Sequence, residues 1–522
     1  MKFKDLTSEQ IDKIKKTYNE KSSNLPWEKR AYKLGEEFGV SERTIRVWAV
    51  NLGLKNKTTI EPEQYTQAKK RKFDKTKKRF IITSAQSCTP INTGFFNNLK
   101  VYANHINAEI LVIPFRYKNT NSVFSKKENE NEWWDENLIP YLTLNRHNLN
   151  ANLVVLGDVP IQPTNVNPLS GLESLTSGES GIVGHTRIHM KTLPVLDSSN
   201  PRFLFSTGVV TLKNFSESKS GKIGEFHATF GAVIVELKEK DEFFVRQITA
   251  DDNTGNFIDL FYEVIDGKLK VVNESLALIK GDIHYGSHDS NVLKKSFDVL
   301  VPLIKPKQII LHDIFDGYSI NPHEEKNFVK QYEKEINGDN SLKEEINNLM
   351  GWLNTLKHLN LVVVFSNHDD FLNRFIINGD PKKNIKNALE YMEYGKILLE
   401  GKAPNGLIAY LISKNFKNIK CLGRNDSYKI NGWELGVHGM DGVNGSKGGI
   451  QQYRRLNSKI ITAHAHSPVR LDGALQVGTN TKLRLSYNNG MSSWAHSDII
   501  IHKNNKAQHI FYDLNGNFTT FK

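Results

Sequence analysis

The sequence predicts a chain of the α/β class, and three observations carry this prediction. First, short apolar runs recur between residues 276 and 466, and each is followed by a cluster of Asp, Asn or His. Second, Lys- and Glu-rich segments at residues 324–358 and 381–400, which read as helices, are inserted between these runs. Third, residues 80–115 have the pattern strand, helix, strand. Strands that alternate with helices are typical of sheets whose faces are covered by helices.

The five apolar runs are expected to be strands that end at polar clusters. They span residues 276–279, 308–311, 359–365, 435–437 and 459–462. Open α/β sheets assemble their sites at the carboxyl ends of the strands. We therefore expect clusters that are roughly 190 residues apart in the sequence to converge at one edge.

The polar clusters contain the residue types that bind divalent cations. In Asp282-Ile283-His284, alternation along a strand puts Asp and His on the same side. The other clusters are Asp313 with Asp316, Asn367-His368-Asp369, His438, and His464-Ala465-His466. A single His-x-His is more often a pair of ordinary surface or hydrogen-bonded histidines, so only the whole ordered series predicts a metal site. Oxygen and imidazole ligands without thiolate suit Mn, Fe, Zn or Mg.

A carboxylate such as that of Asp313 can bridge two metal ions if two bind. Two divalent ions about 3.5 to 4 Å apart repel each other unless an anionic ligand, such as an Asp or a hydroxide, lies between them. Asp313 is the candidate for this bridge.

The order of these motifs resembles the pattern of the calcineurin-like metallophosphoesterases, which runs GDxHxG, GDxxD, GNHD, H, GHxH. The resemblance covers residues 274–500 and implies a two-sheet core flanked by helices, with two divalent metal ions, Mn²⁺ first among the candidates. It implies Asp282, His284 and His466 on the first ion, Asp313 between the ions, and Asn367, His438 and His464 on the second. It also implies that His368 is the general acid and that Asp316 orients it.

Three residues depart from the glycines of that pattern, namely His312, Ser366 and Ala463. A side chain can replace glycine at small cost only where φ is negative. All seven ligand positions and both catalytic positions are nevertheless intact.

Length and composition indicate the number of domains and argue against disulfide-rich, secreted and membrane-spanning proteins. A chain of 522 residues predicts about three domains. The two cysteines, Cys88 and Cys421, are far apart and indicate neither a disulfide framework nor a cysteine metal site. The N-terminus lacks an apolar signal region and no apolar run is long enough to span a bilayer, so we expect a cytoplasmic protein, in the host bacterium if a phage encodes it.

Positive charge is concentrated near the N-terminus. Residues 1–79 contain 21 Lys and Arg against 11 Asp and Glu, a balance of +10 out of a total of +12. This asymmetry favours a polyanionic partner for the first segment. Basic runs at residues 69–72 and 75–79 are typical of a solvated linker, and their position directly after the helix-turn-helix favours a linker that also lies along phosphates.

Residues 27–48 resemble a helix-turn-helix, in which Gly39 forms the turn and Ser41 caps the second helix. The expected core is Leu34, Val40, Ile45 and Trp48. Arg43, Thr44 and Arg46 then face outward, where they can contact DNA in the major groove. The alternative is a small helical module for protein contacts or for a homo-oligomer.

The middle region, residues 80–270, is expected to be an α/β accessory domain. Three interpretations of its His185, Arg187, His189 and His227 are open: a second site, a nucleic-acid surface, or side chains in ordinary hydrogen bonds. The predicted domains are therefore a helix-turn-helix at 1–56, a basic linker at 57–79, the accessory domain at 80–270 and the metallophosphoesterase domain at 271–522.

Three functions fit this organisation. The first is a DNA nuclease, similar to the SbcD and Mre-eleven branch and, in overall organisation, to early host-DNA-degrading nucleases of large tailed phages. In it a bridging hydroxide would attack phosphorus in line and His368 would protonate the departing oxygen. The second is a phosphatase with an N-terminal targeting module, and the third is a DNA-binding regulator with a non-catalytic phosphoesterase scaffold.

Overall fold

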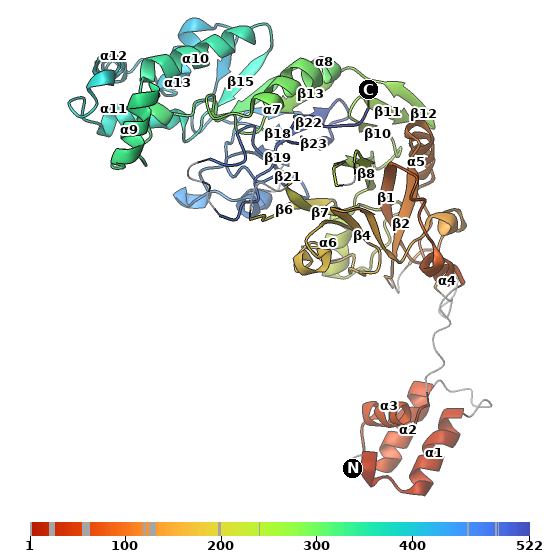
Figure 1. Cartoon of the computed structure of the whole chain (residues 1–522). Helices are drawn as coiled ribbons and strands as arrows, with labels where there is room; N and C mark the ends of the chain where they lie inside the picture. Colours follow the sequence, from red (N-terminus) through yellow and green to blue (C-terminus); the bar gives the residue numbers. More distant parts are fainter. Residues whose placement is uncertain are drawn as a thin grey trace. The chain divides into compact units, whose positions relative to one another are not determined.

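The computed structural model describes residues 3–19, 27–54, 63–117, 119, 122–124, 132–196, 200–239, 241–456, 459–485, 488 and 490–521. The chain forms two compact units, Met1–Thr66 and Gln67–Lys522 (Figure 1). Helices and strands both contribute extensively, as the α/β class requires. Among the described residues, every helix is too short or too polar to cross a bilayer.

The first unit consists mainly of three helices, α1 (Ser8–Asn19), α2 (Trp27–Phe38) and α3 (Glu42–Asn51). Gly39 makes the turn between α2 and α3 with φ of +63°, a conformation that glycine adopts without steric cost. Of the expected core, Leu34, Ile45 and Trp48 are buried, together with Ile14 and Ala31, and Val40 packs against them partly buried.

A short helix, α4 (Glu63–Lys70), lies within the segment that was expected to be a linker. After α4 the chain enters a four-stranded sheet of order β2-β1-β8-β9. Its strands are β1 (Arg79–Gln86), β2 (Glu109–Phe115), β8 (Gly231–Leu237) and β9 (Phe243–Thr249). Helix α5 (Thr93–Ile106) connects the parallel pair β1 and β2, which confirms the predicted strand, helix, strand pattern.

A ten-stranded sheet joins the middle region to the C-terminal region. Its order is β17-β18-β19-β21-β20-β6-β7-β5-β4-β3. The strands from the middle region are β3 (Arg146–Asn150), β4 (Leu153–Leu156), β5 (Ser180–Val183), β6 (His189–Leu193) and β7 (Arg202–Ser206). Those from the C-terminal region are β17 (Lys429–Ile430), β18 (Trp433–Glu434), β19 (Lys459–Thr462), β20 (Val469–Leu471) and β21 (Ala474–Gln476).

The boundary expected between residues 270 and 271 is therefore not a break in the structure. Strand β20 pairs antiparallel with β6, so that Arg470 lies opposite Met190. Backbone hydrogen bonds thus run from the accessory region into the region that carries the last metal motif.

A six-stranded sheet of order β16-β15-β14-β13-β22-β23 packs face to face with the C-terminal part of the ten-stranded sheet. Its strands are β13 (Ser275–Ile279), β14 (Ile309–His312), β15 (Leu361–Val364), β16 (Lys420–Cys421), β22 (Ser497–His502) and β23 (Ala507–Phe511). The two sheets share an apolar core that includes Ile279, Ile310, Val364, Ile461 and Val477. Strands β13 to β16 are parallel, so their carboxyl ends lie at one edge.

Helices cover the other face of the six-stranded sheet (Figure 1). They include α7 (Ser290–Lys295), α8 (Val301–Ile304), α10 (Leu342–Thr355), α11 (Asp369–Asn378) and α13 (Leu407–Asn415). The remaining helices are α6 (Lys219–His227), α9 (Phe328–Asn337), α12 (Ala388–Leu399) and α14 (Ile450–Tyr453). A small sheet contains β10 (Phe257–Asp259), β11 (Tyr262–Ile265) and β12 (Lys268–Val271). The sequence from residue 482 to 487 is also strand-like, but the described part of that range, residues 482–485, forms no strand.

Candidate metal centre

The five predicted clusters meet at one end of the two packed sheets. Asp282 and His284 follow β13, Asp313 and Asp316 follow β14, and Asn367 and His368 follow β15. His438 follows β18, and His464 and His466 follow β19. Parallel strands bring these residues together because their carboxyl ends share one edge.

Asp282, His284 and His466 form one group whose ligand atoms lie within 4.8 Å of one another. His466 Nε2 lies 2.9 Å from Asp282 Oδ2. All three side chains are buried, since Asp282 is fully inaccessible and His466 is only 5% exposed. This is the set that the sequence predicts for the first metal ion.

Asp313 lies between that group and the second predicted set. Its Oδ2 atom is 3.3 Å from His284 Nε2 and 3.5 Å from His438 Nε2. His438 Nε2 also lies 3.1 Å from the Asn367 side-chain oxygen, and the His438 and His464 rings are 5.2 Å apart. One carboxylate oxygen thus faces ligands from both sets, which is the position that a bridging group requires.

His368 lies beside the first group. Its ring centroid is 4.2 Å from that of His284, and its Nδ1 atom donates to the main-chain oxygen of Asp316 at 2.7 Å. The Asp316 carboxylate accepts from Ser287 Oγ at 2.7 Å and lies 3.1 Å from His284 Nδ1. The His368 side chain is partly exposed.

Several ligand residues have left-handed backbone conformations. The φ angles are +43° at His284, +47° at Asp313, +73° at His464 and +58° at His466. Such angles cost free energy in residues other than glycine and concentrate at functional sites.

The three departures from the glycine pattern are not strained in this way. His312, Ser366 and Ala463 do not have positive φ, so their side chains fit without strain. Ser366 even gains a contact, because its hydroxyl donates to Asp313 Oδ1 at 2.6 Å. Ser366 therefore orients the candidate bridge, a role that the sequence pattern did not reveal.

The electrostatics of the site favour positive charge between the carboxylates. Burial opposes ionisation of Asp282, yet His438 and His466 outweigh it and hold its pKa at about 2. Burial likewise opposes ionisation of Asp313, but His284 and His368 bring its pKa well below the usual value. Burial would lower the pKa of His284, whereas Asp313 and Asp316 raise it well above 6.5. Buried carboxylates that stay ionised provide hard oxygen ligands.

The residues fit divalent metal ions. Asp282 Oδ1, His284 Nε2 and His438 Nδ1 are buried and have no hydrogen-bond partner among the described residues. Buried polar atoms are nearly always satisfied, so unsatisfied atoms that face one another indicate a position for a cation. The oxygen and nitrogen donor set suits Mn, Fe, Zn or Mg, so buried Asp and His groups of this chain can hold a metal ion.

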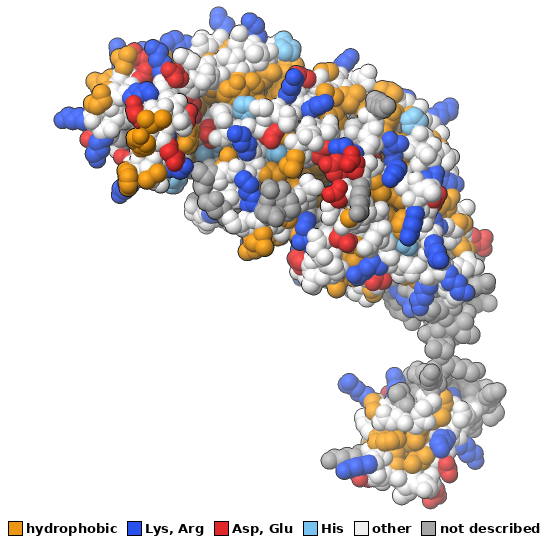
Figure 2. Space-filling model, viewed as in Figure 1, with side chains coloured by type: hydrophobic (Ala, Val, Ile, Leu, Met, Phe, Trp, Pro, Cys, Tyr) orange, Lys and Arg blue, Asp and Glu red, His pale blue; other side chains and the backbone are white. Residues whose placement is uncertain are grey.

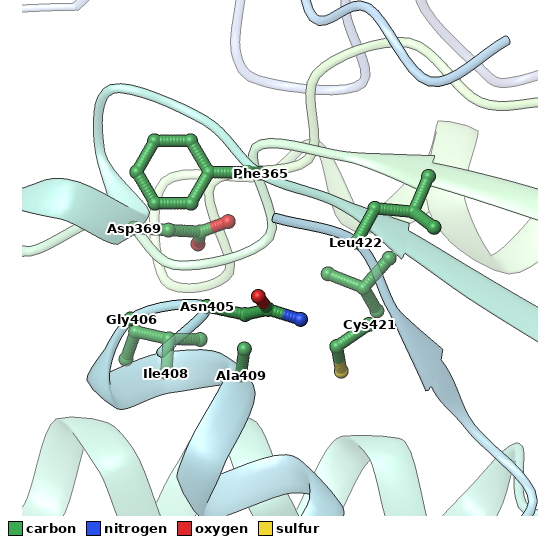
Figure 3. Close-up of a pocket in the computed structure, with 9 residues that line it drawn as sticks. Phe365, Asp369, Asn405, Gly406, Ile408, Ala409, Cys421 and Leu422 are labelled. Carbon is green, nitrogen blue, oxygen red and sulfur yellow. The ribbon is translucent and has the colours of Figure 1, made fainter. Parts of the chain in front are cut away.

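Further buried polar residues surround the centre. His312 is fully buried, neither of its ring nitrogens has a hydrogen-bond partner in the described structure, and its ring stacks 5.6 Å from that of His438. The Asp369 carboxyl faces a small pocket that Asn405 and Cys421 also line (Figure 3). Burial raises the pKa of Asp369 to about 7. The ring of Trp494 also lies at the centre, and its centroid is 4.1 Å from that of His466. The sequence motifs did not indicate this residue.

The predicted DNA-contacting residues lie in the first unit, on α3. Arg43 and Arg46 are exposed, and Thr44 is half-buried. The Thr44 N–H donates to Ser41 Oγ at 3.2 Å, which is the expected cap, and Arg46 forms an ion pair with Glu42.

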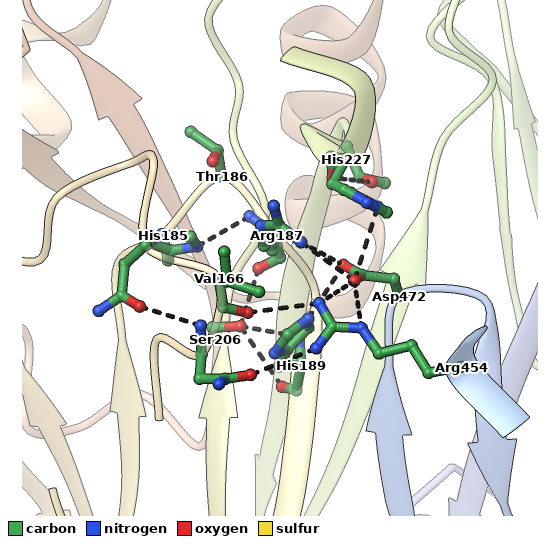
Figure 4. Close-up of polar contacts among 12 residues, drawn as sticks. Val166, His185, Thr186, Arg187, His189, Ser206, His227, Arg454 and Asp472 are labelled. Carbon is green, nitrogen blue, oxygen red and sulfur yellow. Dashed lines mark hydrogen bonds and ion pairs between the residues drawn. The ribbon is translucent and has the colours of Figure 1, made fainter. Parts of the chain in front are cut away.

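The four residues singled out in the middle region also converge, around Asp472 in the turn between β20 and β21 (Figure 4). Asp472 lies 3.0 Å from both Arg187 Nη1 and His189 Nε2, 3.5 Å from His227 Nδ1 and 2.6 Å from Arg454 Nη2. His185 Nδ1 accepts from the Arg187 N–H at 3.0 Å. These residues form a network of ion pairs and hydrogen bonds between the middle region and the C-terminal region. Such a network corresponds to the interpretation of these side chains as hydrogen-bonded in ordinary ways.

Comparison with known proteins gives one informative relationship. No family model matches the sequence, and no solved structure matches it. Protein A1 of Escherichia phage T5 is 31% identical to this chain over 464 residues, which are 84% of this chain and 83% of the relative. Identity of this size over most of both chains indicates common ancestry. The chain therefore belongs to the same family as Protein A1 of Escherichia phage T5.

Proposed function

We propose that this protein is a metal-dependent phosphodiesterase that hydrolyses DNA, with the overall layout of a calcineurin-like metallophosphoesterase. One observation carries the proposal. Asp and His residues that follow five different strands lie together in three groups of potential metal ligands, and these groups share residues. Asp282, His284 and His466 would hold one divalent ion, and Asn367, His438 and His464 a second. Asp313 would lie between them. Mn²⁺ is the first candidate.

Two bound divalent ions would polarise the phosphoryl group and lower the pKa of a water molecule towards about 7. Protein side chains would supply the proton for the leaving group. The main-chain oxygen of Asp316 holds a proton on Nδ1 of His368, so the second proton of the imidazolium form lies on Nε2 and is the one that can be transferred. His368 would give this proton to the departing alkoxide as a general acid.

DNA is the substrate that the rest of the chain favours. The first unit presents Arg43 and Arg46 on an exposed helix that follows a glycine turn, as in a helix-turn-helix. Membership of a family that includes a phage protein is compatible with an enzyme that acts on DNA in an infected cell.

The experiment uses the purified full chain, first treated with a chelator and then supplied with Mn²⁺. We expect Mn²⁺ to restore cleavage of duplex DNA and of bis(p-nitrophenyl) phosphate. Asp282→Asn should abolish both activities because it removes a buried ligand. Asp266→Asn, which changes an exposed Asp in the second unit, is the matched control and should leave both unchanged.

Two results would contradict the proposal. If the metal-loaded protein cleaved neither substrate, it would not be a phosphodiesterase. If it cleaved p-nitrophenyl phosphate but left DNA and the diester intact, the phosphatase interpretation would replace it.

A further inference from the structure

Most of the positive charge near the N-terminus lies in one short segment. Residues 67–79, here called the basic arm, contain eight Lys and Arg against one acidic residue, a balance of +7. Residues 1–66 contain 13 basic and 10 acidic residues, a balance of only +3. The charge that suggested a polyanionic partner for the helix-turn-helix thus belongs mainly to the arm.

The basic arm is packed against the second unit and is not a free linker. Arg71 forms an ion pair with Glu109 at 2.9 Å, and the Asn145 side chain donates to the Arg71 carbonyl oxygen at 2.8 Å. The Phe73 ring lies 5.7 Å from that of Phe80 and 5.1 Å from that of His147. This partly buried ring at the edge of the core helps to hold the backbone of the arm in place.

The end of the arm is anchored as well. Arg79 Nη1 donates to the Ile106 carbonyl oxygen at 3.1 Å, and Arg79 Nη2 donates to Thr520 Oγ1 at 3.0 Å. Strand β1 begins at this residue. Arg71 and Arg79 therefore anchor the arm, and Lys77 adds a hydrogen bond to the Asn107 side chain.

The lysines of the arm face solvent. Those that are exposed are Lys69, Lys70, Lys72, Lys75 and Lys78. Beside them a surface hollow of about 400 Å³ is lined by the basic residues Arg71, Lys77 and Lys100 and by the acidic residues Asp74 and Glu109. Figure 2 shows blue side chains gathered over the part of the second unit that carries β1, β2 and α5. The second unit thus has a fixed, strongly positive strip of its own.

We propose that the basic arm binds the phosphodiester backbone of DNA and holds the polymer on the second unit independently of the helix-turn-helix. This inference rests on the proposed function and names a second site for the same substrate. Flexible lysine ammonium groups contact phosphates as point charges and carry no base specificity. The arm therefore supplies sequence-independent affinity.

Counterion release makes the proposal measurable. Each phosphate that a cation neutralises adds about 0.9 to the slope of log affinity against log salt concentration. The full-length protein is titrated with a fluorescent duplex of about 30 base pairs, in EDTA so that no cleavage occurs, at several salt concentrations. The arm variant carries Lys69→Gln, Lys70→Gln, Lys72→Gln, Lys75→Gln and Lys78→Gln.

We expect the arm variant to lose at least about tenfold in affinity at low salt, and its salt slope to flatten by about two or more. The matched control neutralises five exposed lysines elsewhere on the second unit, namely Lys307, Lys343, Lys357, Lys382 and Lys383, and should change the slope far less. Arg43→Gln combined with Arg46→Gln tests the helix-turn-helix separately. Thermal unfolding of each variant shows whether the fold is intact.

A salt slope in the arm variant equal to that of wild type or of the control would overturn the proposal. So would a wild-type protein that binds vesicles of phosphatidylserine and phosphatidylcholine but not DNA, since the arm would then meet a membrane surface. This outcome can be distinguished from failure of the proposed function, because a protein without hydrolytic activity could still show the predicted change in DNA binding. Normal hydrolysis of bis(p-nitrophenyl) phosphate by the arm variant shows that the metal centre is unaffected.

Discussion

His368 donates its Nδ1–H to the main-chain oxygen of Asp316 at 2.7 Å, whereas the Asp316 carboxylate is 4.0 Å from the same nitrogen. The carboxylate contacts His284 and Ser287 instead. The family resemblance implies that this carboxylate orients His368, but in the structure the backbone contact is the shorter one. The main-chain oxygen of Asp316 thus sets the tautomer of His368, and the carboxylate of the same residue sets that of His284.

His368→Ala should slow cleavage of DNA by roughly 10² to 10⁴ and affect a nitrophenyl diester much less. An alkoxide leaving group needs a proton as it departs, and nitrophenolate does not. Rates on both substrates, measured with saturating Mn²⁺, test this. An equal loss on the two substrates would mean that His368 supports metal binding and not proton transfer.

Asp316→Asn should slow both substrates to a similar degree. The variant keeps the main-chain oxygen that holds His368, but it weakens the contact between residue 316 and the candidate ligand His284. Outer partners of a ligand typically contribute about 10- to 100-fold to metal affinity or activity. If the variant instead lost activity only on DNA, as expected for His368→Ala, the carboxylate would act on the acid after all.

Asp313→Asn should lower the number of metal ions bound per chain and abolish hydrolysis. The neutral amide cannot screen two cations from each other, although it has the size of the carboxylate. Metal content of the purified variant, measured by atomic emission and compared with that of Asp266→Asn, tests the prediction. Normal content with full activity would contradict the bridging role.

Ser366→Ala should weaken metal binding while the fold stays intact. It removes the hydroxyl that donates to Asp313 Oδ1 and accepts from the Asp369 N–H. We expect a loss of about 10-fold or more in apparent Mn²⁺ affinity, taken from the activation curve. Ser413→Ala, which removes an exposed hydroxyl on α13, should have no effect. Unchanged Mn²⁺ activation in Ser366→Ala would show that Asp313 needs no such support.

The stability of the protein should fall as the pH drops below about 6.5. Burial lowers the pKa of His185 and His509 to about 3 and that of His502 to about 4. Between these values and 6.5 the unfolded chain binds more protons than the folded chain, so acid favours unfolding. Each such histidine contributes up to about 1.4 kcal/mol per pH unit.

Melting temperatures between pH 7.5 and pH 5 test this prediction. His509→Gln keeps a group that can donate to the Gln476 carbonyl oxygen, and its melting temperature should depend less on pH than that of the wild type. His105→Gln, at an exposed position on α5, should follow the wild type. Equal pH dependence in all three proteins would mean that His509 does not titrate on unfolding in this range.

Local patterns predicted much of the fold. The apolar runs before Asp282, Asp313 and Asn367 became parallel strands, because three to five consecutive apolar residues can be buried on both faces of a covered sheet. Helical periodicity and a glycine turn predicted α2 and α3 with the core residues Leu34 and Trp48. In each case the signal lies within a few neighbouring residues.

Relationships between distant segments were not predictable in the same way. Nothing near Asp472 in the sequence indicates that Arg187 and Arg454 will share its carboxylate. Arg187 is 285 residues away from Asp472 in the sequence, and the two segments meet where β20 pairs with β6. Likewise, the basic arm has the composition of a linker. Its contacts with distant residues, such as those of Arg71 with Glu109 and of Phe73 with Phe80, make it part of the second unit.

The pairing of β20 with β6 also bears on how this protein can be divided. A chain that began at residue 271 would expose the backbone N–H and C=O groups of Val469–Leu471, which β6 now satisfies. An unprotected strand edge of this kind recruits other strands and leads to aggregation. A fragment chosen from the metal motifs alone should therefore be poorly soluble, and one that starts near residue 67 should behave as an autonomous folding module.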